Sequence, residues 1–215
     1  MQKKTYAVLG LGRYGTAVAK ELVKNGADVI AVDKNEQIVR DSSVYLPICK
    51  CADITDPEVI SELGISNADV VIVAMASSLE GSILAITLCK EAGVKTIIAK
   101  CANETHRKIL KRVGADTVVF PENESGTRLA KNLLTSGFTD ILTLSDDLSL
   151  VELAARDEWV GKSLKELNLR KKYTVNVVAF RKNGKITAPV NPEELLDKDT
   201  EIIAIVNTAK LSKLK

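Results

Sequence analysis

Long apolar runs are missing from this 215-residue chain. No stretch approaches the roughly 18–20 consecutive apolar residues that a membrane-spanning helix needs, and the longest, such as residues 70–76, has the length of a strand. The N-terminal residues MQKKTYAVLG enter a short strand at once and lack the apolar region of a secretory signal. We therefore expect a soluble, cytoplasmic protein that would serve a membrane process only by docking onto a separate partner.

Aromatic residues are also scarce, at 4% of the chain, and neither sign of charge dominates, since the formal net charge is +2. Nucleic-acid-binding proteins normally need a basic surface and aromatic platforms on which bases stack, so we expect no nucleic acid partner. The four cysteines form no C-x-x-C pair, and Cys49 and Cys51 lie two apart in an expected strand. We interpret them as small buried thiols in a reducing cytosol rather than as a metal or redox site.

What the chain does contain is a regular alternation of strand-like and helix-like segments over its first 120 residues. The expected strands cover 6–9, 28–32, 47–51, 70–74, 96–99 and 117–120. Six strands alternating with helices predict right-handed βαβ units, and hence an α/β fold with a Rossmann-type doubly wound parallel sheet. A further helix, over about 124–135, would link this sheet to the rest of the chain.

The pattern changes near residue 140. Residues 148–154, 174–180 and 201–206 are strand-like, residues 160–167 suggest a short helix, and Asn183-Gly184 is typical of a tight hairpin turn. This half is predicted to be a small C-terminal α+β domain. We place the two domains at residues 1–138, which include the linker helix, and 139–215.

A nucleotide site is indicated by Gly10, Gly12 and Gly15, which fit G-x-G-x-x-G between an apolar strand and a helix. The first glycine permits the tight turn, the second lets a pyrophosphate approach the backbone, and the third lets helix and strand pack closely. The helix N-terminus favours an anion. Asp33 ends the second strand, where a carboxylate can accept hydrogen bonds from ribose hydroxyls and would repel a 2′-phosphate. Adenosine nucleotides are therefore favoured over NADP.

Three charged residues extend this candidate site. Arg13 lies in the first helical turn, where a cation opposes the helix dipole, which makes sense if a polyphosphate binds beside it. Asp53 follows the third strand and Lys100 ends the fifth, and ligands bind at the carboxyl ends of strands in open α/β sheets. The alternative interpretation is an exposed helix residue for Arg13 and a purely structural role for Asp53 and for Lys100.

Together these residues resemble the RCK (regulator of potassium conductance) family of Ktr/Trk-type potassium-uptake subunits. The segments that carry the resemblance are GLGRYG at 10–15, VDKN at 32–35, AD at 52–53, AKCANETHRKILKRVGADTVVFPE at 99–122 and VGKSLKELNLRKKYTVNVVAFRKNGKI at 160–186. The resemblance covers nearly the whole chain, and one Rossmann copy with one C-terminal copy looks like the short, KtrA-type form. One departure is Ala52, where the family often has glycine.

The resemblance implies a cytoplasmic regulatory subunit that gates a bacterial potassium channel or transporter in response to ATP and ADP, or alternatively to NAD and NADH. It also implies a homodimer that assembles into an octameric ring beneath a membrane-embedded potassium-translocating subunit. The protein would then lie at the inner face of the cell membrane through that partner.

The resemblance further implies the roles of individual residues. The nucleotide contacts that carry over are Gly10, Gly12, Arg13, Tyr14, Gly15, Asp33, Lys34, Asn35, Asp53, Ala74, Lys100 and Glu122. Glu122 also matches a carboxylate that helps hold a divalent cation, Mg²⁺ or Ca²⁺, between protomers of some members. Arg170 and Asn176 match positions that line a pocket for a second ligand, cyclic di-AMP, in KtrA-type members.

Two other functions compete with this one. An NAD-dependent oxidoreductase needs an acid/base group, but the only histidine, His106, falls inside a predicted helix of the Rossmann domain, so we expect no enzymatic activity. A redox-sensing repressor needs a basic helix-turn-helix, whereas the second half of the chain consists mostly of predicted strands.

Overall fold

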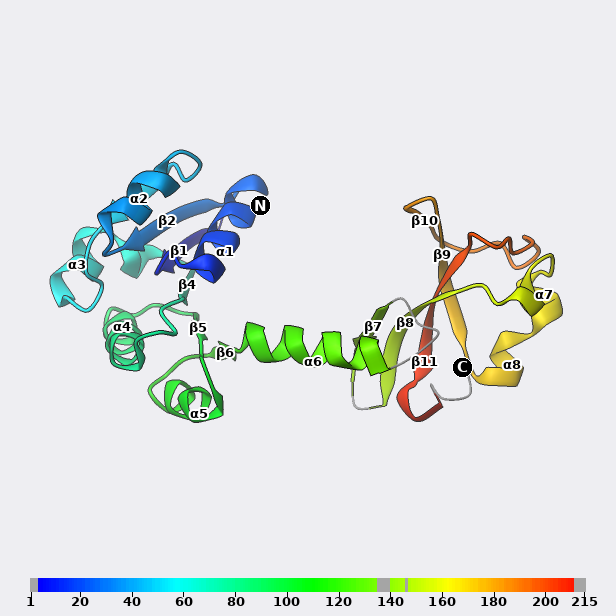
Figure 1. Cartoon of the computed structure of the whole chain (residues 1–215). Helices are drawn as coiled ribbons and strands as arrows, with labels where there is room; N and C mark the ends of the chain where they lie inside the picture. Colours follow the sequence, from blue (N-terminus) through cyan, green and yellow to red (C-terminus); the bar gives the residue numbers. More distant parts are fainter. Residues whose placement is uncertain (1–3, 135–139, 146, 211–215) are drawn as a thin grey trace. The chain divides into compact units, whose positions relative to one another are not determined.

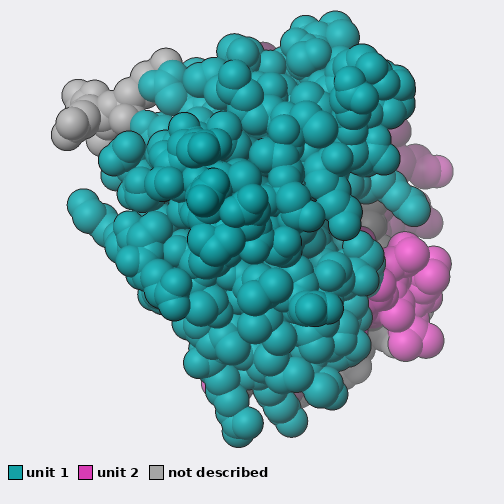
Figure 2. All heavy atoms as spheres, turned by 90° about the vertical axis from the view of Figure 1, so that its left-hand side faces the viewer, with its two compact units in different colours: residues 1–122 teal, residues 123–215 magenta. Residues whose placement is uncertain are grey.

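The computed structural model describes residues 4–134, 140–145 and 147–210. The chain divides into two compact units, Met1–Glu122 and Asn123–Lys215 (Figure 2). The division falls within helix α6 (Pro121–Leu134), earlier than the boundary predicted after residue 138. The side-chain oxygen of Asn132 in this helix accepts the backbone N–H of Ile141 at 3.0 Å.

The first unit is built on a parallel six-stranded sheet with the order β3-β2-β1-β4-β5-β6 (Figure 1). Its strands are β1 (Thr5–Leu9), β2 (Asp28–Asp33), β3 (Ile48–Cys51), β4 (Val70–Val73), β5 (Ile97–Lys100) and β6 (Thr117–Val119). Its helices are α1 (Arg13–Lys24), α2 (Glu36–Ser43), α3 (Pro57–Glu62), the 3-10 turn η1 (Ile65–Asn67), α4 (Leu79–Glu91) and α5 (Glu104–Arg112). This strand order is that of the doubly wound Rossmann fold, so the predicted fold class is confirmed.

Alternate residues of the strands pack into two separate cores. Val8, Ala31 and Ile72 contribute to a core with apolar residues of α1 and α2. Their strand neighbours, Leu9 and Val32 among them, contribute to a larger core with residues of α3, α4 and α5. Leu9 is fully buried, and burial of a side chain of this size is worth about 1.5–3 kcal/mol. The sheet is therefore covered on both faces, as its nearly continuous apolar strands predict.

Helix starts in this unit follow local hydrogen bonding. Asp56 accepts the N–H of Glu58 at 3.0 Å and Pro57 is the first helical residue of α3, two features that are typical of a helix start. Side chains cap three other helices in the same way: Asn35 at α2, Ser78 at α4 and Asn103 at α5.

The second unit is an antiparallel sheet with the order β10-β9-β11-β8-β7. Its elements after α6 are β7 (Asp140–Thr143), β8 (Leu148–Ala154), η2 (Asp157–Trp159), α7 (Leu164–Leu167), α8 (Leu169–Tyr173), β9 (Asn176–Lys182), β10 (Lys185–Thr187) and β11 (Glu201–Asn207). Trp159, Phe180 and Ile202 lie in its core. The predicted α+β class and the Asn183-Gly184 hairpin are confirmed, with φ angles of 49° and 75° at the two turn residues.

Two glycines of the turn between β1 and α1 differ in the space around them, so replacing each by alanine should affect stability differently. A Cβ atom on Gly15 would lie 1.9 Å from the carbonyl oxygen of Gly10, whereas one on Gly12 would meet nothing within 4 Å. Gly15→Ala should therefore lower the free energy of unfolding by about 1–3 kcal/mol or more. Gly12→Ala, at the N-cap of α1, should cost less than about 1 kcal/mol. Urea unfolding followed by circular dichroism compares the two, and equal stabilities would contradict the packing role of Gly15.

Candidate functional site

A cavity of about 520 Å³ lies at the carboxyl ends of β1, β2, β3 and β4. Six of the predicted contacts line it: Gly10, Gly12, Asp33, Lys34, Asp53 and Ala74. Its volume is typical of a small-molecule site. It lies where the strand order reverses between β1 and β4, which is where doubly wound sheets bind ligands.

The turn between β1 and α1 forms one wall of this cavity. Gly10 has a φ of 94° and its N–H donates to the carbonyl of Val32 at 2.8 Å. A Cβ atom at Gly10 would lie 2.7 Å from Cγ of Met75. Gly12 is the N-cap of α1, and the space beside its Cα is open. The turn thus has the tight bend and the open backbone that a pyrophosphate needs.

Helix α1 differs at its start from the other helices of this unit. The helices α2, α3, α4 and α5 each have a side-chain cap and an acidic residue in the first turn. Helix α1 has neither, and it begins with Arg13. Its first turn therefore keeps the partial positive charge of a helix N-terminus without an acidic neighbour on the helix.

Asp33 connects the end of β2 to the glycine turn. Its Oδ2 accepts the N–H of Leu11 at 2.7 Å and its Oδ1 accepts the N–H of Asn35 at 2.8 Å. A carboxylate oxygen has a second lone pair, so Asp33 can hold the turn and still accept a hydroxyl from the cavity. The backbone part of this role is not apparent from the sequence.

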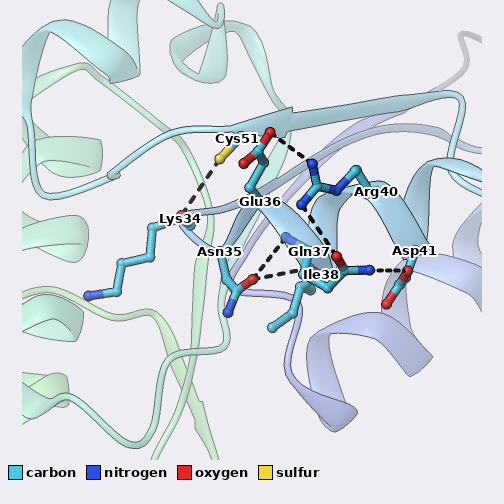
Figure 3. A network of polar contacts seen from close by, with 8 residues as sticks. All are labelled: Lys34, Asn35, Glu36, Gln37, Ile38, Arg40, Asp41 and Cys51. Atoms are coloured by element: carbon cyan, nitrogen blue, oxygen red, sulfur yellow. Dashed lines mark hydrogen bonds and ion pairs between the residues drawn. The ribbon is translucent and has the colours of Figure 1, made fainter.

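The residues after Asp33 divide between the cavity and helix α2 (Figure 3). Asn35 caps α2, because its Oδ1 accepts the N–H groups of Gln37 at 2.9 Å and Ile38 at 3.3 Å. Lys34 lines the cavity, and Figure 3 shows its side chain extending away from α2. The carbonyl oxygen of Lys34 accepts a weak hydrogen bond from the thiol of Cys51 at 3.6 Å. The predicted ribose contact of Asn35 stays a prediction.

Asp53 lies beyond the end of β3 as an ionised acceptor. Its Oδ1 accepts the N–H of Thr55 at 3.0 Å and the hydroxyl of Thr55 at 2.7 Å. These hydrogen bonds hold the pKa of Asp53 below its usual value. The group therefore stays anionic at neutral pH and can accept hydrogen bonds from a ligand.

The other predicted residues form a second group, beside the first turn of α1. Nζ of Lys100 donates to Oε1 of Glu122 at 2.6 Å and lies 5.7 Å from the centre of the Tyr14 ring. The hydrogen bond from Lys100 is the main cause that lowers the pKa of Glu122, and the charge of Arg13 contributes. None of these four residues lines the cavity of the described chain. Gly15 is likewise absent from the wall and acts through packing.

Sequence reasoning missed the part of the wall that follows β4. Six such residues line the cavity: Met75, Ser77, Ser78, Glu80, Gly81 and Leu84. Ile38 of α2, also missed, lines it as well. The rule that ligands bind at the carboxyl ends of strands, applied to β4 as it was to β3 and β5, would have indicated the loop at 75–78. Ile38 and Leu84 supply the apolar surface on which a flat base can lie.

The predicted second site involves two surface positions of the second unit. Arg170 is exposed on α8 and Asn176 is the exposed first residue of β9. Arg170 is followed on this helix by two further cations, Lys171 and Lys172. Within the described ranges, no group of three His, Cys, Asp or Glu side chains could hold a metal ion, and the cation site at Glu122 stays a prediction.

The cysteines only partly match the expected buried thiols. Cys89 and Cys101 are buried, and burial raises the pKa of Cys89 to about 12. Cys51 is exposed, because β3 is an edge strand of the sheet. Over the part of the chain that the structure describes, no helix is both long and apolar enough to cross a membrane.

The chain matches the family models of the TrkA-N domain over residues 6–121 and of the TrkA-C domain over residues 148–215. It is 35% identical to the Ktr system potassium uptake protein C of Bacillus subtilis (strain 168), over 99% of this chain and 96% of that protein. It is 34% identical to the Ktr system potassium uptake protein A of the same organism, over 98% and 94% of the two chains. Among solved structures, it resembles the GsuK RCK domain, with a TM-score of 0.69 and 18% identity over 99% of this chain and 47% of that chain.

Proposed function

Because the chain belongs to the RCK family of Ktr/Trk-type potassium-uptake regulatory subunits, we propose that it binds an adenosine nucleotide in the cavity at the ends of β1–β4 and thereby gates a membrane-embedded potassium-translocating subunit. The proposed nucleotide binding rests mainly on the position of Asp33. Its carboxylate accepts a hydrogen bond from the glycine turn and also lines the cavity. The relatives of this chain are potassium uptake proteins rather than enzymes, as expected. The oxidoreductase alternative is therefore dropped.

The cavity offers a separate surface for each part of such a nucleotide. Asp33 would accept the ribose hydroxyls and Asp53 would lie on the adenine side. The open backbone of Gly12 and the uncapped start of α1 would receive the phosphates. NAD and NADH satisfy the glycines and Asp33 as well, so they remain the alternative ligands.

Control of transport requires that the ligand distinguish two conformations of the assembly. A nucleotide with equal affinity for both would shift neither population. We propose that ATP and ADP provide the difference, because Arg13 places a cation beside the phosphates. A cation near a terminal phosphate stabilises a triphosphate more than a diphosphate.

Helix α6 supports the proposal that the chain forms a homodimer, assembled further into an octameric ring. The helix has 14 residues and none of them is buried in a single chain. A helix of this length is marginal in water without packing. Its three leucines are between 59% and 82% exposed: Leu129, Leu133 and Leu134. A second copy of the chain would cover the exposed leucines of α6. We place the resulting assembly in the cytoplasm, at the inner face of the membrane.

Replacing Asp33 tests the nucleotide site. Asp33→Ala should weaken ATP and ADP binding by roughly 1–3 kcal/mol, the cost of losing hydrogen bonds to a charged group. Asp41→Ala is the matched control, because Asp41 is an exposed carboxylate on α2 outside the cavity. Calorimetric titration of nucleotide-free protein gives the affinities, and thermal unfolding shows whether the turn survives. Unchanged ATP and ADP affinity in a folded Asp33→Ala variant would contradict the role of Asp33 in nucleotide binding.

Replacing Arg13 tests the discrimination between ATP and ADP. Arg13→Ala should lose the preference for ATP while it retains ADP binding, because only the longer phosphate chain reaches the guanidinium. The same titration with both nucleotides measures the ratio of dissociation constants. If both affinities fall by the same factor, Arg13 is a general phosphate contact and does not discriminate.

We also propose that the second unit binds cyclic di-AMP between two copies. A two-fold symmetric dinucleotide fits a two-fold symmetric cleft, because each copy offers the same contacts to one half. Arg170 would meet a phosphate and Asn176 a base or phosphate. Both side chains are exposed and therefore accessible to such a ligand.

Titration of the full chain with cyclic di-AMP tests this second site. We expect one dinucleotide per dimer, with binding lost in Arg170→Ala and largely kept in Lys171→Ala. Lys171 is the control because it is an exposed cation on the same helix. Absence of heat with a folded dimer, or equal losses in the two variants, would remove the proposal.

A further inference from the structure

Among the carboxylates that line the cavity, Glu80 differs from Asp33 and Asp53 in what its oxygens do. Asp33 uses both of its oxygens, and Asp53 one, to accept hydrogen bonds from the chain itself. Glu80 is exposed, and its side chain makes no hydrogen bond or ion pair with another residue that the structure describes. Both of its oxygens are therefore available to a ligand in the cavity.

The loop that leads to Glu80 is held in place by its own hydrogen bonds. Oγ of Ser82, a residue that is 1% exposed, lies 3.1 Å from the carbonyl oxygen of Met75 and 2.8 Å from that of Ser78. Ser78 also caps α4, because its Oγ accepts the N–H of Gly81 at 3.0 Å. The first turn of α4, and Glu80 with it, is therefore fixed relative to the end of β4.

The same loop packs against the glycine turn, on the side away from Asp33. A Cβ atom at Gly10 would lie 2.7 Å from Cγ of Met75, so the turn and the loop are in close contact. Strand β1, which leads into the turn, lies between β2 and β4 in the sheet. Asp33 ends β2, whereas Glu80 follows β4. The turn where a pyrophosphate would bind thus has a carboxylate on each side.

A carboxylate on each side of the phosphate position suits a ligand that has a sugar at each end of its pyrophosphate. We propose that Glu80 is a specificity-determining residue, which accepts the hydroxyls of a second ribose and so shifts the preference of the cavity toward dinucleotides and ADP-ribose. The inference rests on the proposed nucleotide function and deepens it, because it names what selects between two classes of ligand. A carboxylate accepts hydrogen bonds from hydroxyl groups, whereas it repels a further phosphate in the same place.

The charge of the cavity wall favours the same class of ligand. The charged residues that line the described cavity are three carboxylates and one ammonium group: Asp33, Asp53, Glu80 and Lys34. A dinucleotide brings only the charge of its pyrophosphate to this wall, which the start of α1 can offset. ATP brings a further phosphate, on which Arg13 and Glu80 would act in opposite senses. These two residues together would set how strongly ATP competes with a dinucleotide.

Replacing Glu80 tests this role against its alternative, the stabilisation of a helix N-terminus by an acidic residue. Glu58 is the matched control, because Glu58 and Glu80 are each the exposed second residue of a capped helix, and only Glu80 lines the cavity. Glu80→Ala should weaken the binding of NAD and of ADP-ribose about fivefold or more. It should leave the affinities for ADP and ATP unchanged or raise them, and Glu58→Ala should change none of the four. Calorimetric titration of the nucleotide-free full chain in EDTA measures these affinities, and thermal unfolding shows that each variant is folded.

The other possible results each contradict the proposal in a different way. Unchanged NAD affinity overturns it, and so does a loss that ADP and ATP share, which would mean that Glu80 supports the fold or the phosphate position. A loss for NAD that ADP-ribose does not share would place the contact at the nicotinamide and overturn it. A loss that appears only with MgCl₂ present would mean that Glu80 acts through a cation, which also overturns it.

Failure of the inference can be distinguished from failure of the proposed function. Wild-type protein that binds ADP but neither NAD nor ADP-ribose would overturn the inference and leave the proposed nucleotide function standing. Wild-type protein that binds none of these adenosine nucleotides would refute the proposed function, and the inference with it.

Discussion

The close contact between the start of α1 and the end of β1 is the constraint on which the site depends. Gly15 lies so near the carbonyl of Gly10 that only a hydrogen atom fits between them. This contact fixes the direction of α1, and with it the position of the open backbone at Gly12. Asp33 then ties the same turn to β2 through Leu11. The ends of β1 and β2 and the start of α1 are thus held around one cavity. The close packing of Gly15 against Gly10 and the hydrogen bond accepted by Asp33 hold them there.

Charge is distributed unevenly around this turn, and in the proposed function this distribution would set the direction of the nucleotide. Asp33, Asp53 and Glu80 line the cavity, where carboxylates suit hydroxyl and amine groups and repel phosphates. Arg13 and Lys100 lie on the other side, by the first turn of α1. Sheet order explains the separation of Asp33 and Asp53 from Lys100, because β2 and β3 flank β1 on one side and β5 follows on the other. Glu80, which follows β4, is an exception.

Features that depend on neighbours in sequence were predictable, and those that depend on distant contacts were not. The cap at Asp56-Pro57 and the turn at Asn183-Gly184 follow from local backbone preferences, and the parallel six-stranded sheet follows from the alternation of strands and helices. The pairing of Lys100 with Glu122 spans 22 residues and has no local signal. Asn35 carries a double signal, since a residue that can contact ribose can also cap a helix, and the structure shows the cap. The short elements β7 and α8 were not predicted, because their sequences show no clear periodic pattern of apolar residues.

The exposure of α6 supports the proposal that the chain assembles with further copies. A buried core resists small perturbations, because every displaced side chain loses packing. Helix α6 has no buried residue in the single chain, so its position is determined by what covers it and by the few polar contacts at its ends. One of these contacts is made by Glu122, whose partner Lys100 lies beside Tyr14 in the first turn of α1. A change of a single ion pair can therefore bias an element that one chain alone holds weakly, whereas the same change could not move a packed helix such as α4.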